Sequence, residues 1–251
     1  MPSTYLRIEP HQIAPDAILV GDPARVQVAA EHLSAITAQG KNREYSWVTG
    51  IARATGKPVT VVACGIGAPA WAIALTELHA AGARRFVRVG TALTPLLPLS
   101  TIALARSVLR CDRVSEDYLP LHVPVLPDAD LMQALHRAFR PEDGPVAEVL
   151  FASFSTFYGE MEPLPLGGGA AAPGGLDQRE FRRALATGAQ AVDMETGLVL
   201  AFAQRFGAAA ASVCLCTVTG DGGPVLDKET QRDREQTLIA GVLAALAATW
   251  R

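Results

Sequence analysis

The sequence predicts an α/β fold, because buried strand-like runs alternate with helical segments along the chain. Residues 59–63 form an uncharged, β-branched run that is typical of a strand buried on both faces. A glycine turn follows this run, and residues 73–81 then have the apolar spacing of a loose amphipathic helix that ends at Gly82. Residues 86–89 form a second apolar strand. The 251-residue length fits one large α/β domain or two small ones, and no linker is evident.

Composition and charge narrow the class of protein. Hydrophobic residues make up 49% of the chain and charged residues 19%, which fits a soluble globular protein with much buried strand and a buried subunit interface. The net charge is −3, without a basic patch or a run of like charges, so neither nucleic acid nor an anionic membrane is expected as the main partner. The longest uncharged run, residues 58–76, is broken by two glycines and Pro69, which argues against a membrane span.

The cysteines and the N-terminal segment favour a reduced, cytoplasmic setting. The four cysteines include no C-x-x-C pair and have no nearby histidine, so no metal site is expected. The first residues lack a basic region followed by an apolar core, and we therefore expect no signal peptide.

The glycine turn after the first strand admits two interpretations. Gly65 and Gly67 let the backbone bend sharply, and Pro69 suits the first turn of a helix. With Ala70, the two glycines also satisfy the G-x-G-x-x-G/A pattern of dinucleotide-binding folds. The second strand, however, ends at residues 89–92 without the acidic residue that would hold a ribose hydroxyl. We therefore favour a different ligand.

Arg88 is the first candidate for binding an anion. It lies inside the second apolar strand, where the period of two places it on one face with Phe86 and Gly90. A buried guanidinium must find an anion, because an isolated buried charge is costly.

Arg25 is the second candidate. It follows a short apolar strand at residues 17–20 and falls in the first turn of a helix expected to reach about Leu33. Asp22 suits the N-cap and Pro23 the N1 position, so free backbone N–H groups point out of the turn. The helix dipole disfavours a cation there unless an external anion lies between them. The alternative is a solvated surface arginine.

The remaining elements follow from similar patterns. Strands are expected at residues 104–109, 149–152 and 210–218, and helices at residues 128–139, 178–185, 196–206 and 228–249. Arg43 opens a segment that resembles a hairpin around Gly50 and Gly56. The uncharged, Gly- and Pro-rich residues 163–176 are typical of a functional lid or of a disordered loop.

Two acids flank Met194 at the start of an uncharged helix. Asp193 is explained as an N-cap, whereas Glu195 is less well accounted for in that way. A carboxylate near a helix N-terminus stays ionised and can accept hydrogen bonds from hydroxyls. Phe157 belongs to a nearby aromatic segment, for which core packing is the alternative to ligand stacking.

Three motifs, taken together and in order, resemble the nucleoside phosphorylase family, which includes uridine phosphorylases and the hexameric purine nucleoside phosphorylases. They are GDPARV at residues 21–26, GIGAPAWAIALTELHAAGARRFVRVGTA at residues 65–92 and VDMETGLVL at residues 192–200. Their order and spacing match the family over nearly the whole chain.

The resemblance implies a single α/β domain over residues 1–251, with a mixed, barrel-like central sheet surrounded by helices. It also implies phosphorolysis, in which a nucleoside and inorganic phosphate give a free base and a pentose 1-phosphate. Phosphate is then a co-substrate, and no metal or organic cofactor is needed. The family further implies a homo-oligomer and favours a hexamer.

The resemblance assigns roles to individual residues. The implied phosphate-binding residues are Gly21, Arg25, Arg88 and Thr91, with Arg43 reaching into a neighbouring subunit's site. The implied ribose-binding residues are Met194 and Glu195, and Tyr5 stands nearest to the histidine with which relatives reach the 5′-hydroxyl. Phe157 and Asp221 are the candidates for binding the base, and Arg88, Glu195 and Asp221 are the expected catalytic residues.

The base preference rests on two departures from the family. The purine enzymes carry an acid directly after a Val-Ser pair, whereas Gly220 stands between Thr219 and Asp221 here. The neighbouring glycines give the backbone the freedom to turn the Asp221 carboxyl inward, where it could protonate a leaving purine. The Gln and Arg that read uracil in uridine phosphorylases have no match in residues 159–162. The sequence therefore favours purine nucleosides, with uridine phosphorylase, a hydrolytic nucleosidase and a non-catalytic nucleoside-binding module as alternatives.

Overall fold

The computed structural model of the chain describes residues 1–157, 178–219 and 225–249. Its strands are β1 (Asp16–Val20), β2 (Leu33–Asn42), β3 (Tyr45–Ala52), β4 (Pro58–Ala63), β5 (Arg85–Thr94), β6 (Ile102–Cys111), β7 (Val146–Phe154), β8 (Ala191–Asp193) and β9 (Ala209–Thr219). Its α-helices are α1 (Ala24–Glu31), α2 (Ala68–Ala81), α3 (Val114–Tyr118), α4 (Ala129–Ala138), α6 (Arg179–Ala186), α7 (Thr196–Phe206) and α8 (Lys228–Ala248), and the 3-10 helices are η1 (Pro10–Gln12) and η2 (Pro141–Asp143).

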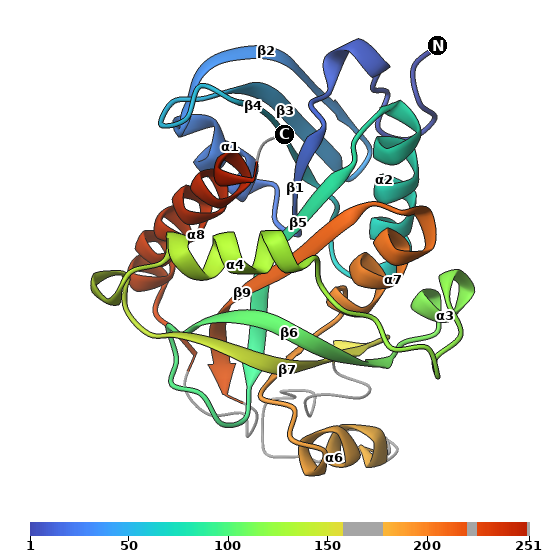
Figure 1. The fold of residues 1–251 in the computed structure, drawn as a ribbon, viewed down its shortest axis with the longest axis vertical. Helices are drawn as coiled ribbons and strands as arrows, with labels where there is room; N and C mark the ends of the chain where they lie inside the picture. Colours follow the sequence, from blue (N-terminus) through green and yellow to red (C-terminus); the bar gives the residue numbers. More distant parts are fainter. Residues whose placement is uncertain (158–177, 220–224, 250–251) are drawn as a thin grey trace, which may run out of the picture.

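The strands form one mixed sheet that closes on itself at one end (Figure 1). Their order is β2-β3-β4-β1-β5-β8-β7-β6-β9, and β9 pairs back onto β5. Strands β5, β8, β7, β6 and β9 therefore form a closed ring, and the other four strands extend the sheet from β5. The expected α/β fold with a barrel-like central sheet is confirmed.

Helices cover the sheet on two sides. Helices α1, α4 and α8 bury their apolar side chains in one core cluster, and α2 and α7 bury theirs in a second cluster, against which α3 also packs. In Figure 1, α8 crosses next to α4 and α1, and these pairs are in contact. Helix α7 is buried over most of its length, which explains its uncharged start. No helix of the described residues is long and apolar enough to cross a membrane.

Strand register brings two chain turns to the same edge of the sheet. Val20 at the end of β1 lies beside Ala63 at the end of β4 and beside Val89 of β5, and all three strands run parallel. The turns that follow β1 and β4 therefore meet at that edge. The Gly65 N–H donates a hydrogen bond to the Gly21 carbonyl oxygen over 3.1 Å.

Two predictions about local structure are wrong in detail. Helix α1 starts one residue late because Pro23 is its N-cap, and the Asp22 side chain accepts a hydrogen bond from the Ala24 N–H at 2.8 Å. Gly50 is not a hairpin turn. It lies inside β3, where a Cβ atom would come within 2.3 Å of the Ala35 carbonyl oxygen in β2, so the glycine permits a close approach of two strands. The β2–β3 turn lies at Arg43, whereas the expected turn at Gly56 is confirmed, because Gly56 has a φ of +68° between the antiparallel strands β3 and β4.

Candidate functional site

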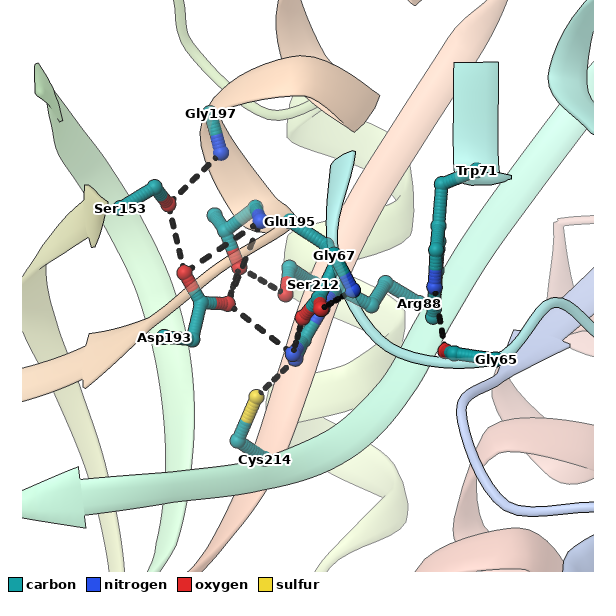
Figure 2. A network of polar contacts seen from close by, with 11 residues as sticks. Gly65, Gly67, Trp71, Arg88, Ser153, Asp193, Glu195, Gly197, Ser212 and Cys214 are labelled. Carbon is teal, nitrogen blue, oxygen red and sulfur yellow. Dashed lines mark hydrogen bonds and ion pairs between the residues drawn. The ribbon is translucent and has the colours of Figure 1, made fainter. Parts of the chain in front are cut away.

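Arg88 forms the centre of a buried polar network at the junction of β5, β9 and the start of α7 (Figure 2). Its Nη2 atom donates to Glu195 Oε2 at 2.6 Å and lies 3.2 Å from Asp193 Oδ2. Burial opposes the charge on Arg88, but the neighbouring carboxylates of Asp193 and Glu195 raise its pKa above the ordinary value for arginine. The expected buried arginine is therefore a permanent cation, and its present counter-ions are carboxylates of its own chain.

Two further side chains, Trp71 and Cys214, contact this guanidinium. The Trp71 ring lies 5.5 Å from Arg88 Cζ, within the range of a cation–π contact, and the indole N–H donates to the Gly65 carbonyl oxygen at 2.9 Å. Arg88 Nη1 contacts the sulfur of Cys214. Burial raises the pKa of the Cys214 thiol to about 12, so this thiol is neutral at pH 7. Arg88 Nε has no hydrogen-bond partner within the described parts of the chain.

Glu195 connects the arginine to the glycine turn. One of its carboxylate oxygens accepts the Arg88 hydrogen bond, and the other accepts the Gly67 N–H at 2.7 Å. Gly67 has a φ of +94°, a backbone conformation that glycine adopts readily. Met194, the preceding residue, also lies near this turn, with its Cε atom 3.7 Å from the position that a Gly67 Cβ would take. Three residues with separate expected roles, Arg88, Met194 and Glu195, therefore lie together.

Asp193 is fixed by hydrogen bonds from two elements. It accepts from Ser153 Oγ of β7 at 2.5 Å and from the Thr196 N–H of α7 at 3.2 Å. The Ser153 hydroxyl oxygen in turn accepts the Gly197 N–H at 2.9 Å. The N-cap explanation of Asp193 is thus partly right, since the carboxylate does hold a free N–H of α7. The ion pair of Asp193 with Arg88 was not predicted, although Asp193 lies only two residues before Glu195.

Gly21 and Thr91 lie at the same edge of the sheet as this network. Val20 pairs with Val89 in the β1–β5 ladder, so Gly21 begins one residue after this pair and Thr91 follows two residues after it. Thr91 is half-buried in β5. The structure therefore brings two of the expected phosphate residues to the end of the strand that carries Arg88.

Arg25 is not a solvated surface arginine. It is 7% exposed, and its Nη2 donates to Glu235 Oε1 of α8 at 2.8 Å. The sequence gives no local signal for this partner, because the two residues are 210 positions apart.

Arg43 and Tyr5 form a separate pair. Arg43 is exposed in the β2–β3 turn with a φ of +53°, and its guanidinium carbon lies 5.4 Å from the centre of the Tyr5 ring. The Tyr5 N–H donates to Glu77 of α2 at 2.8 Å, which holds the N-terminal segment in place. Neither residue belongs to the network of Figure 2.

The expected base-binding residues fall only partly on the described chain. Phe157 is half-buried and packs against the same apolar cluster as Met194. Asp221 and residues 159–162 lie outside the described residues. Within the described parts, no group of three or more His, Cys, Asp and Glu side chains is placed to hold a metal ion.

A family model described as the Phosphorylase superfamily matches residues 15–248 of the chain. The chain resembles a uridine phosphorylase from Treponema pallidum, with 36% identity over 163 residues, or 63% of this chain and 62% of that enzyme's length. It also resembles a guanosine phosphorylase from Halorubrum lacusprofundi, at 28% identity over 93% of this chain and 89% of that protein.

A solved structure shares the fold. The uridine phosphorylase of Vibrio fischeri superposes with a TM-score of 0.77 and 22% sequence identity, covering 98% of this chain and 94% of that one. At this level of identity the match concerns the architecture alone.

Proposed function

Because this chain belongs to the Phosphorylase superfamily, we propose that it is a nucleoside phosphorylase. In the proposed reaction, the bond between the base and C1′ of the sugar breaks and its electron pair leaves with the base. An oxygen of inorganic phosphate then forms the new bond to C1′, giving a pentose 1-phosphate. The reaction is a pentosyl transfer that requires no metal or organic cofactor.

The observation that carries this proposal is the contact of 2.6 Å between Arg88 and Glu195. Arginine is well suited to phosphate and a carboxylate to sugar hydroxyls. If phosphate takes the guanidinium and the ribose takes the carboxylate, the two reactants meet side by side. Holding both reactants in this way lowers the barrier by removing their freedom to separate.

The charges of the site suit the chemistry. Cleavage of a glycosidic bond passes through an oxocarbenium-like state, in which positive charge develops on the sugar. Phosphate on one side and Glu195 on the other would stabilise that charge. Asp193 and the Gly67 N–H hold Arg88 and Glu195 in fixed positions, so little reorganisation is needed during the reaction.

The other residues complete the proposed site. Gly21, Arg25 and Thr91 join Arg88 in holding phosphate, and Met194 packs against the ribose. Phe157 stacks on the base. Arg43 and Tyr5 serve the site of a neighbouring copy in a homo-oligomer.

We propose uridine as the first nucleoside to test. Relatives from several bacteria are named uridine phosphorylases, whereas one relative is named a guanosine phosphorylase. The expected preference for purines depended on Asp221 and residues 159–162, which lie outside the described residues. Inosine is therefore the comparison substrate, and Asp221 is the proposed general acid for a purine.

Hydrolysis by a nucleosidase is the second candidate function. It is favoured by one observation, that Arg25 and Arg88 are both already paired with carboxylates of the chain itself. A site whose arginines already have counter-ions has no obligatory need for the charge of phosphate.

Base release from uridine and inosine, measured with and without phosphate, tests the proposal. We expect release that depends on phosphate and an accumulation of pentose 1-phosphate. Equal rates without phosphate, with free ribose as product, would identify a nucleosidase. Binding of both nucleosides without any turnover would instead identify a non-catalytic module. If inosine is cleaved, an Asp221→Ala variant that cleaves it equally fast removes Asp221 from the mechanism.

A further inference from the structure

Arg25, one of the proposed phosphate ligands, already forms a buried ion pair with Glu235. Arg25 lies in the first turn of α1, and Glu235 lies in the second turn of α8. Their side chains are 8% and 13% exposed, and Nη2 and Oε1 are 2.8 Å apart. This arrangement gives Arg25 a full negative charge as its partner before any ligand arrives.

Glu235 is held in this position from its own helix. The Gln231 side-chain N–H donates to the same Glu235 oxygen at 2.8 Å, one helical turn earlier. A second polar contact joins the two helices nearby. The Nε2 atom of His32, which follows α1, lies 2.7 Å from the Oε1 atom of Gln236 in α8. Helix α8 therefore presents a positioned carboxylate to the start of α1.

The location of Arg25 makes this pairing relevant to the ligand. Arg25 follows the turn at Gly21, which comes directly after Val20, and Val20 pairs with Val89 of the strand that carries Arg88 and Thr91. The sequence predicted free N–H groups at the start of α1, but the N–H groups of Ala24 and Arg25 both donate to oxygens of Asp22. In the proposed function, phosphate bound at this turn contacts the Arg25 side chain, whose charge is already compensated by Glu235.

We infer that Glu235 is a built-in competitor for phosphate, a carboxylate that holds Arg25 in the empty site and must be displaced for phosphate to bind. The inference rests on the proposed function, because it takes Arg25 as a phosphate ligand. If phosphate and Glu235 both contacted the Arg25 guanidinium, their negative charges would lie within a few ångströms of each other. Their repulsion would weaken phosphate binding. The apparent affinity for phosphate is then reduced by the fraction of molecules in which the pair is closed.

Glu235→Gln tests this role because it removes the charge and nearly preserves the shape. Titration calorimetry with inorganic phosphate alone should show binding about tenfold tighter than in the wild type, which corresponds to about 1.4 kcal/mol. Asp233→Asn is the matched control, since it removes one charge from an exposed position on the same helix and should leave the affinity unchanged. Adding Arg25→Gln to the Glu235→Gln variant should abolish the gain.

The melting temperature, measured with and without phosphate, tests the role of Glu235 independently. Without phosphate, Glu235→Gln leaves a buried guanidinium without its counter-ion, so the melting temperature should fall. Phosphate should then raise the melting temperature of this variant more than that of the wild type, because a ligand stabilises the state to which it binds more tightly. If the variant does not fold, Glu235→Asp retracts the carboxylate by one methylene and should give a smaller gain in affinity.

The outcomes separate this inference from the proposed function. An affinity for phosphate that is unchanged or weaker in the folded variants overturns the role of Glu235, even if phosphorolysis is observed. Tighter binding in Glu235→Gln supports the role of Glu235, even if base release proves independent of phosphate. If neither wild type nor variant binds phosphate, both ideas are wrong.

Discussion

At the scale of single residues, the site depends on the space around the Arg88 guanidinium. Gly90, two residues along the same strand, supplies that space. A Cβ atom on Gly90 would lie 2.5 Å from Arg88 Nη1 and 2.7 Å from Cζ, which is closer than non-bonded atoms can come. The guanidinium is the mobile end of a long side chain, so it would move before the backbone did.

Gly90→Ala should therefore damage activity more than stability. We expect the displaced guanidinium to lose its geometry with Glu195 and kcat/KM to fall by about 10²- to 10³-fold, as when a preorganised charge is removed. The unfolding free energy, measured in urea, should fall by about 1 to 3 kcal/mol, the usual cost of overpacking a core, because the guanidinium shifts within its buried ion pairs. Wild-type activity in this variant would show that the position of Arg88 seen here is not the active one.

Residue-level prediction from sequence succeeded where the signal was local. The apolar context of Arg88 indicated burial and the need for an anion, and the acids around Met194 indicated a polar site. The partners could not be predicted in the same way. Glu195 is 107 positions from Arg88 and Glu235 is 210 positions from Arg25, and only the sheet and the packing of α8 on α1 bring them together.

At the scale of elements, strong periodicity predicted most helices and strands, and weak patterns hid the rest. Strand β2 is mostly exposed and polar, so it is stabilised by pairing with β3 rather than by an apolar face of its own. Strand β8 has three residues, too few to show any alternation, yet it closes the ring between β5 and β7. The glycine turn after β4 was recognisable because only glycine adopts its positive φ values at low cost.

Asp112 lies where β6, α3 and α7 meet, and its burial leads us to expect a pH effect on stability. It follows β6, accepts the Ser115 N–H at the start of α3 over 2.6 Å, and leaves its other oxygen buried near Gly197 of α7. That oxygen has no hydrogen-bond partner in the described chain. Burial raises the pKa of Asp112 above 3.8, only partly offset by the hydrogen bonds from Ser115.

The sign of the pH effect follows from this raised pKa. Above pH 3.8 the unfolded carboxyl ionises while the folded one keeps its proton, so Asp112 reduces stability as the pH rises through the folded pKa. Asp112→Asn keeps the acceptor for Ser115 and cannot ionise. Its unfolding free energy relative to the wild type should therefore increase from pH 4 to pH 7. A difference that stays constant with pH would mean that the folded pKa of Asp112 is not raised.

At the scale of the whole molecule, the expected site residues fall into two separate groups within one chain. Arg88, Met194 and Glu195 lie together at the end of the barrel, whereas Arg43 stacks on Tyr5 at the β2–β3 turn, outside that network. The N-terminal segment is fastened there by Glu77 and by the Asn42 side chain, which donates to the Tyr5 carbonyl oxygen at 2.8 Å. The second group is thus preformed, with Arg43 exposed and Tyr5 half-buried, which suits a contribution to the site of a neighbouring copy.

Mixing two inactive variants tests this division of the site between copies. Arg43→Ala and Arg88→Ala should each lower activity severely. In a mixed pair of copies, one site has lost both arginines and the other has kept both, so random mixing should restore about a quarter of the wild-type activity. Refolding or exchanging the two variants together, with sedimentation to show that the copies associate, makes the measurement. Restored activity requires Arg43 to act across the interface. If the mixture stays as inactive as its components, or if a monomer proves active, Arg43 serves its own chain or no site at all.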